Sequence, residues 1–152
     1  MAAEFLRNDV QTVAVNSPVI LDTSIGCTSG YVYHRPQSGI LTLRGIVKCP
    51  NACFATYQVT FNANIAIPEG GTVGPIAVAL AIDGEPIPTS RAIVTPAAVD
   101  NYFNVTSTAI IKVPRGCCFN VSVENVSEPA TTGGVAPAIN VQNANLVVDR
   151  IA

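Results

Sequence analysis

The sequence predicts an all-β fold, an antiparallel sandwich, barrel or jelly roll with about eight to ten short strands and no helix. The clearest indication is the stretch from Asn101 to Asn125, in which apolar and polar residues alternate on both sides of Pro114–Gly116. Alternation with period two is typical of strands that have one buried and one exposed face. We therefore expect a hairpin here, with a tight turn at Pro114–Gly116. Residues 57–67 alternate in the same way, and no segment shows helical periodicity.

The other predicted strands are shorter and follow one another along the chain. They are expected at 11–15, 18–22, 31–34, 40–44, 76–82, 86–94 and 139–151. Residues 76–82 are apolar on both faces, and one face carries only alanine, so the protein's own chain or a second copy must cover it closely. Asp83-Gly84 predicts a tight hairpin turn. Residues 1–10 show no alternation, which favours a separate N-terminal arm ahead of a single domain at 11–152.

Composition indicates an apolar chain that buries surface both inside a fold and between copies. Charged residues make up only 12% of the sequence and hydrophobic residues 49%, whereas about 25% charged is usual for a soluble domain. No apolar run approaches the roughly 18 residues of a membrane helix, and no signal-peptide pattern is present, so we expect no membrane partner. The eight Lys and Arg residues are scattered along the sequence, which argues against nucleic acid as a partner.

The five cysteines are Cys27, Cys49, Cys53, Cys117 and Cys118. Their odd number and irregular spacing favour reduced structural thiols over a disulfide framework. In the predicted strand, Cys117 would be buried and Cys118 half-exposed. Zinc at Cys49 and Cys53 is the alternative, but a second ligand pair of suitable spacing is missing. We therefore expect no metal site, and the redox state of the thiols stays open.

Signals for catalysis are weak. His34 is the single histidine and lies beside a predicted strand end; a Cys–His pair stays open, although no local motif supports one. The sequence lacks a nucleophile elbow and a phosphate-binding loop. Asp83 and Glu85 could contact calcium, but the turn at Gly84 explains them equally. The sequence thus predicts no enzyme and no cofactor.

The order of several short motifs resembles a known family. The motifs are Gly39-Ile-Leu-Thr-Leu, TYQVTFNANI at 56–65, Asp83-Gly84-Glu85-Pro86, Val113-Pro114-Arg115-Gly116 and LVVDRI at 146–151. In this order they resemble the C1q/TNF-like jelly roll in its bacterial and phage form, over residues 39–151. The resemblance implies an antiparallel jelly-roll sandwich that assembles as a homotrimer.

The resemblance also implies a structural protein of a virion, namely a capsid decoration or head-fibre protein on the surface of a phage head. Its N-terminal arm would dock on the major capsid protein through Phe5, Leu6 and Arg7. The trimer interface would contain Tyr57, Phe61, Tyr102 and Phe103. Two alternatives remain: a trimeric receptor- or glycan-binding fibre tip, and a spore-surface protein. The loop at 127–137 has no aromatic residue of the kind that stacks on sugars, which disfavours the first.

Overall fold

A computed structural model describes residues 1–26 and 30–152 of the chain. These residues form twelve β-strands and one short 3-10 turn, η1 (Pro88–Ser90). The strands are β1 (Ala2–Arg7), β2 (Gln11–Val13), β3 (Thr23–Ile25), β4 (Val32–His34), β5 (Leu41–Arg44), β6 (Phe54–Ala66), β7 (Ile76–Ile82), β8 (Glu85–Pro86), β9 (Ala92–Val94), β10 (Phe103–Pro114), β11 (Cys118–Asn125) and β12 (Ile139–Arg150). Over the described residues, no helix has the length and apolar character needed to span a membrane.

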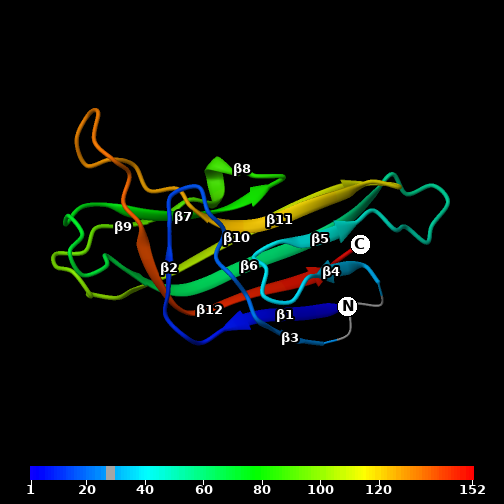
Figure 1. Cartoon of the computed structure of the whole chain (residues 1–152). Coiled ribbons are helices and arrows are strands. Elements are labelled where there is room, and N and C mark those ends of the chain that lie inside the picture. Colours follow the sequence, from blue (N-terminus) through cyan, green and yellow to red (C-terminus); the bar gives the residue numbers. More distant parts are fainter. Residues whose placement is uncertain (27–29) are drawn as a thin grey trace.

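The strands form two antiparallel sheets of six strands that pack face to face (Figure 1). In sheet A the order is β10, β6, β12, β1 and β3, and β2 also pairs with β12. In sheet B the order is β4, β5, β11, β7 and β8, and β9 also pairs with β7. The prediction of an all-β antiparallel sandwich is therefore confirmed.

The core lies between the two sheets and follows from the alternation in each long strand. Along β6, Tyr57, Val59, Phe61 and Ile65 are fully buried, whereas the polar residues between them face outward. From sheet B, the inward residues of β7, such as Leu80, meet them in the same core. β6 lies between β10 and β12, so both of its edges are paired within sheet A.

The predicted hairpin at Asn101–Asn125 is wrong in its pairing, although its turn exists. The N–H of Cys117 donates to the Pro114 carbonyl at 2.9 Å, which closes the turn. However, β10 pairs with β6 in sheet A, and β11 pairs with β5 and β7 in sheet B. The connection between β5 and β6 packs on the turn, and a Cβ on Gly45 would overlap the Pro114 carbonyl oxygen. Alternation shows which residues share a face, but it does not show which sheet a strand joins.

The first residues are a strand and not a separate arm. β1 lies inside sheet A, between β12 and β3, and pairs with β12 from Ala2 opposite Asp149 to Arg7 opposite Ala144. Ala3 and Phe5 face the core and are buried. The domain boundary predicted at residue 10 therefore has no counterpart, because residues 2–7 complete the same sheet as β12.

Two other predictions hold around β7. Asp83 and Gly84 join β7 to β8 with φ angles of 51° and 83°, as a type I′ hairpin turn requires. Ala77, Ala79 and Ala81 are buried within the single chain, so its own residues cover the alanine face. A second copy is not needed there.

Candidate functional site

The four residues predicted to form a trimer interface do not share one surface. Tyr57 and Phe61 have no exposed area, because their side chains lie between the two sheets. They are core residues of one chain, which corrects their assignment to an interface. Tyr102 is half-buried, and Phe103 is 40% exposed at the first position of β10. For these two residues the interface assignment stays a prediction.

The three predicted docking residues all lie in β1. Phe5 is buried, with its ring centroid 5.0 Å from that of His34. Leu6 is half-buried opposite Asn145 of β12, and Arg7 places its Nε 3.9 Å from the carboxylate of Asp22. Docking through a free arm would need these side chains on an accessible segment, so this part of the prediction is corrected. The signal missed in the sequence was the short alternation of Ala3 and Phe5.

Side-chain amides and hydroxyls cover the outer face of sheet A. The Asn104 amide donates to the Oδ1 atoms of Asn62 at 2.9 Å and Asn64 at 3.2 Å, and the Thr106 hydroxyl donates to Asn62 Oδ1 at 2.9 Å. Further pairs across the strands are Thr108 with Thr60, Asn64 with Asn143, and Asn145 with Glu4. We call this set the amide ladder. Sequence alternation predicted that these residues face outward, but not that they bind one another across strands.

Apolar side chains adjoin the amide ladder on the same face. Ile110 of β10 is 55% exposed and lies opposite Gln58, while Val147 of β12 and Leu6 of β1 are half-buried. The charged residues of this face are Glu4, which belongs to the amide ladder, and Lys112 and Asp149 beside it. The face is thus a broad, mostly uncharged surface on which many side chains are already held in place.

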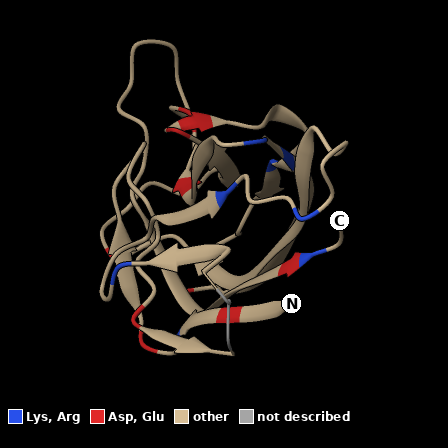
Figure 2. Cartoon of the chain, turned by 90° about the vertical axis from the view of Figure 1, so that its right-hand side faces the viewer, with Lys and Arg blue, Asp and Glu red and all other residues tan. Residues whose placement is uncertain are grey.

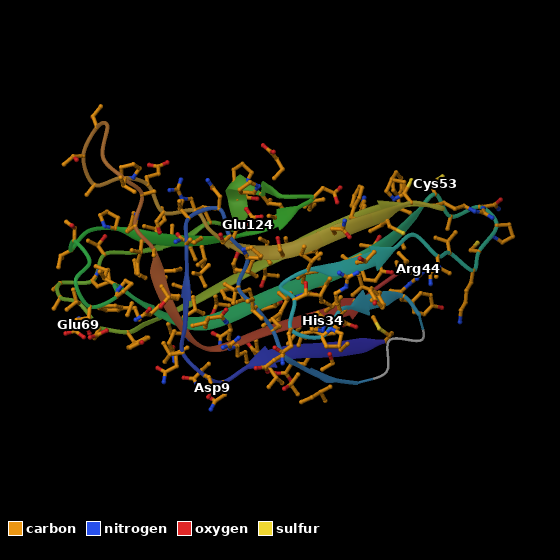
Figure 3. The ribbon with its side chains drawn as sticks, viewed as in Figure 1. Asp9, His34, Arg44, Cys53, Glu69 and Glu124 are labelled. Atoms are coloured by element: carbon orange, nitrogen blue, oxygen red, sulfur yellow. The ribbon has the colours of Figure 1, made fainter. Side chains whose placement is uncertain are left out.

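Sheet B carries a buried carboxylate. Glu124 lies on β11 opposite Ala79, and the Ser122 hydroxyl donates to its carboxylate at 3.5 Å (Figure 3). Burial raises the pKa of Glu124, the Ser122 bond opposes the rise, and the nearby Glu85 carboxylate adds to it. Glu124 is therefore destabilising when ionised.

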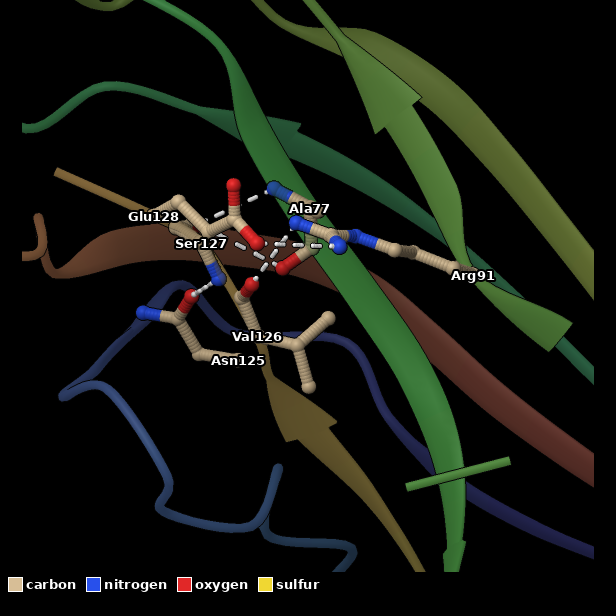
Figure 4. A network of polar contacts seen from close by, with 6 residues as sticks. All are labelled: Ala77, Arg91, Asn125, Val126, Ser127 and Glu128. Atoms are coloured by element: carbon tan, nitrogen blue, oxygen red, sulfur yellow. Dashed lines mark hydrogen bonds and ion pairs between the residues drawn. The ribbon is translucent and has the colours of Figure 1, made fainter. Parts of the chain in front are cut away.

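Another polar network holds the base of the long loop that follows β11 (Figure 4). The Asn125 side chain is fully buried, donates to the carbonyls of Val13 and Pro137, and accepts the Ser127 N–H at 3.0 Å. The Ser127 hydroxyl accepts the Ala77 N–H at 2.9 Å. Beyond this base the loop is exposed, and the side chain of Val135 is 91% accessible. The network fixes where the loop leaves the sandwich.

Arg91 joins the same region from the side. Its guanidinium lies 3.3 Å from the Glu128 carboxylate and also donates to the Val126 carbonyl (Figure 4). A cavity of about 410 Å³ lies between this loop and the 68–75 turn, with Val135, Pro68 and Pro75 among its lining residues. Its walls are mostly apolar.

The described cysteines are Cys49, Cys53, Cys117 and Cys118, and all four are free and exposed. The burial predicted for Cys117 is wrong, because β11 begins one residue later and Cys117 belongs to the turn. Cys27 lies outside the described residues. No group of three or more metal-ligating side chains gathers within the described chain, so neither zinc at the cysteines nor calcium at Asp83 and Glu85 has a ligand set there.

His34 has a structural environment. Its Nε2 lies 2.8 Å from the Ser38 carbonyl and its Nδ1 lies 3.3 Å from the Ser24 hydroxyl, so the ring bridges two neighbouring segments. With Nε2–H donating to the carbonyl, Nδ1 accepts from the serine. The His34 side chain is therefore held by hydrogen bonds and packing within the fold.

Comparison with known proteins finds matches in structure only. No protein-family model and no curated protein sequence matches this chain. Solved structures do match over nearly the whole chain. The globular domain of zebrafish complement 1qA protein matches with a TM-score of 0.66 at 14% identity, covering 99% of this chain and 96% of that one. Eiger TNF from S. frugiperda matches at 0.65 and 12% identity, covering 100% and 92%, and murine APRIL at 0.61 and 11%, covering 99% and 98%. The chain therefore has the C1q/TNF-like jelly-roll fold that the order of its motifs predicted.

Proposed function

We propose that this chain is a non-enzymatic structural protein that self-associates as a homotrimer through the outer face of sheet A. The amide ladder is the observation that carries the proposal. Its side chains are mostly uncharged and already bonded to one another across β10, β6, β12 and β1. The C1q/TNF-like fold supports self-association, because domains of this class are typically homotrimers.

The physical argument concerns the free energy needed to cover this face. Polar groups that keep their hydrogen bonds lose less on desolvation than free charges do, and side chains already fixed lose little further entropy. Apolar contacts add a favourable contribution: Ile110 is 55% exposed, and covering it would stabilise an assembly by about 1 kcal/mol. A face of this kind is suited to a second copy of the same chain.

The oligomeric state tests the proposal directly. We expect light scattering on the purified protein under reducing conditions to give the mass of three chains. Ile110→Lys should give a folded monomer, since a charge would be buried without a partner. Ile40→Lys is the matched control, because Ile40 is 46% exposed just before β5 of sheet B. A monomeric wild-type protein at every concentration, or equal effects of the two variants, would overturn the assignment of the interface.

The setting that we propose is the surface of a phage head, with the major capsid protein as partner. Support comes from the order of the motifs between residues 39 and 151, which resembles that of the bacterial and phage form of the fold. Because Phe5 is held in the core of the sandwich, attachment would use exposed surface and not a free arm. Immunogold labelling of intact particles should place the protein over the head. Label at tail-fibre tips would instead support a receptor- or glycan-binding role, and label on spores a spore-surface role.

A further inference from the structure

One end of the sandwich gathers most of the positive charge of the chain. Five of the eight Lys and Arg residues lie there, because several strand ends and their loops meet at this point. They are Arg44, Lys48, Lys112, Arg115 and Arg150. Figure 2 looks onto this end and shows basic segments near the C-terminus. In Figure 3, Arg44 lies at this end and Glu69 at the opposite one. The sequence alone suggested scattered basic residues, so the clustering is a product of the fold.

A cavity of about 660 Å³ opens among these basic groups. Its walls include Lys48 and Arg150 together with the apolar or aromatic side chains of Tyr31, Val47 and Phe54. Within the described part of the chain, neither Asp nor Glu contributes to its lining. Cavities of this size accommodate small organic ligands. The combination of two cations with aromatic walls defines which ligands would fit.

Arg150 is the central residue of this cavity. Its guanidinium carbon lies 4.2 Å from the ring centroid of Tyr31 and 5.8 Å from that of Tyr57, so two aromatic rings hold its position. The Tyr57 hydroxyl donates to the Arg44 carbonyl at 2.6 Å and is thereby fixed as well. Burial raises the pKa of Tyr57, and the Arg150 charge opposes that rise.

One face of the Arg150 guanidinium is satisfied by these rings, but its donors are not all used. Nη1 is buried and has no hydrogen-bond partner in the residues that the structure describes. Among the residues that the structure describes, Arg7 and Arg91 form ion pairs and Arg150 does not. A partly desolvated cation without a counter-charge is unfavourable. An oxyanion that accepts from the part of the guanidinium facing the cavity would compensate the charge that Nη1 shares, without having to reach Nη1 itself.

We propose that this cavity binds an oxyanion carried on a sugar-sized body, such as the carboxylate or sulfate group of an acidic sugar. Arg150 would hold the anionic group through its planar fork, and Lys48 would add a second positive charge. Tyr31 and Phe54 would contact the apolar face of the sugar ring. The site lies at the end of the sandwich, apart from the amide ladder, so this inference does not depend on the trimer.

Calorimetric titration with three matched probes tests the proposal. Glucuronate presents a carboxylate, glucose 6-sulfate a sulfate, and glucose neither. At low ionic strength we expect saturable binding of at least one anionic sugar, with a Kd of about 1 mM, and no detectable binding of glucose. The stronger of the two anionic probes identifies which oxyanion the cavity prefers.

Variants separate the cavity from general surface charge. Arg150→Met keeps an unbranched apolar side chain over Tyr31 and should weaken binding at least tenfold. Arg35→Met removes the same charge from an exposed position between β4 and β5 and should leave the Kd within twofold of wild type. Arg150→Lys retains the charge without the fork and should also lose most of the affinity.

Circular dichroism establishes that each variant is folded before titration. If Arg150→Met does not fold, Lys48→Met in the loop before β6 replaces it, with an expected loss of at least threefold. The proposal is overturned if wild type binds neither anionic sugar at tens of millimolar. It is equally overturned if Arg35→Met weakens binding as much as the cavity variants do.

Discussion

Replacing Phe5 by alanine distinguishes a core strand from a docking arm. In the structure the Phe5 ring is 2% exposed and lies 5.0 Å from the His34 ring, inside the sandwich. Truncating a buried phenylalanine removes its transfer free energy and leaves a cavity, which together lower stability by about 3–5 kcal/mol. For a chain of this length the loss corresponds to a fall in Tm of about 10 °C.

Leu6→Ala is the matched control, because Leu6 is the next residue on the same strand but faces outward and is half-buried. We expect it to lower stability by about 1 kcal/mol, since less apolar area is lost. Thermal and urea unfolding are followed by circular dichroism under reducing conditions, at two protein concentrations a factor of ten apart. The reasoning is refuted if Phe5→Ala lowers stability no more than Leu6→Ala does, because β1 would then behave as an arm.

Three further predictions concern polar groups in the core. Because burial raises the pKa of Glu124, its contribution to stability is present below its unfolded-state pKa and is lost as pH rises through the folded-state value. Glu124→Gln should therefore stabilise the protein at pH 7 and flatten the rise in Tm on mild acidification; an unchanged pH profile would contradict this. Asn125→Ala should lower the free energy of unfolding by roughly 3 kcal/mol, since it removes the side-chain partner of one buried carbonyl, one part-buried carbonyl and one buried N–H. Urea unfolding measures this change in the free energy of unfolding. The prediction would be refuted if Asn125→Ala lost less stability than the control Asn120→Ala, whose side chain is exposed. Tyr57→Phe should cost about 1 kcal/mol by the same assay, because it removes the bond to the Arg44 carbonyl. No loss would mean that water replaces this bond.

The sequence carried enough information for the long strands and their faces. β7 spans Ile76–Ile82 as predicted, and β6 extends the predicted 57–67 strand at its start. The turn at Asp83-Gly84 was readable because a type I′ turn needs positive φ at both central residues. These features are local, so neighbouring residues suffice to specify them.

Features that depend on contacts between distant segments could not be predicted from the sequence. β1 has too few residues for its alternation to stand out, and its burial depends on β12 at the other end of the chain. The sequence correctly predicted that Tyr57 and Phe61 lie on the same face of one strand. Whether that face packs against the other sheet or against another copy of the chain depends on how the sheets pack. Likewise, Arg44 and Arg150 become neighbours only when β5 and β12 reach the same end of the sandwich.

The pairing of β1 with β12 has a consequence for the order of folding. Ala2 lies opposite Asp149, so a central pair of sheet A joins segments that lie far apart in the sequence. Contacts between segments so distant in the chain form slowly. At typical synthesis rates β1 waits about 10–30 s for its partner to be made. During that interval its apolar side chains and one edge of β6 are open to chaperones or to neighbouring nascent chains. The sandwich can therefore be completed only after β12 has been synthesised.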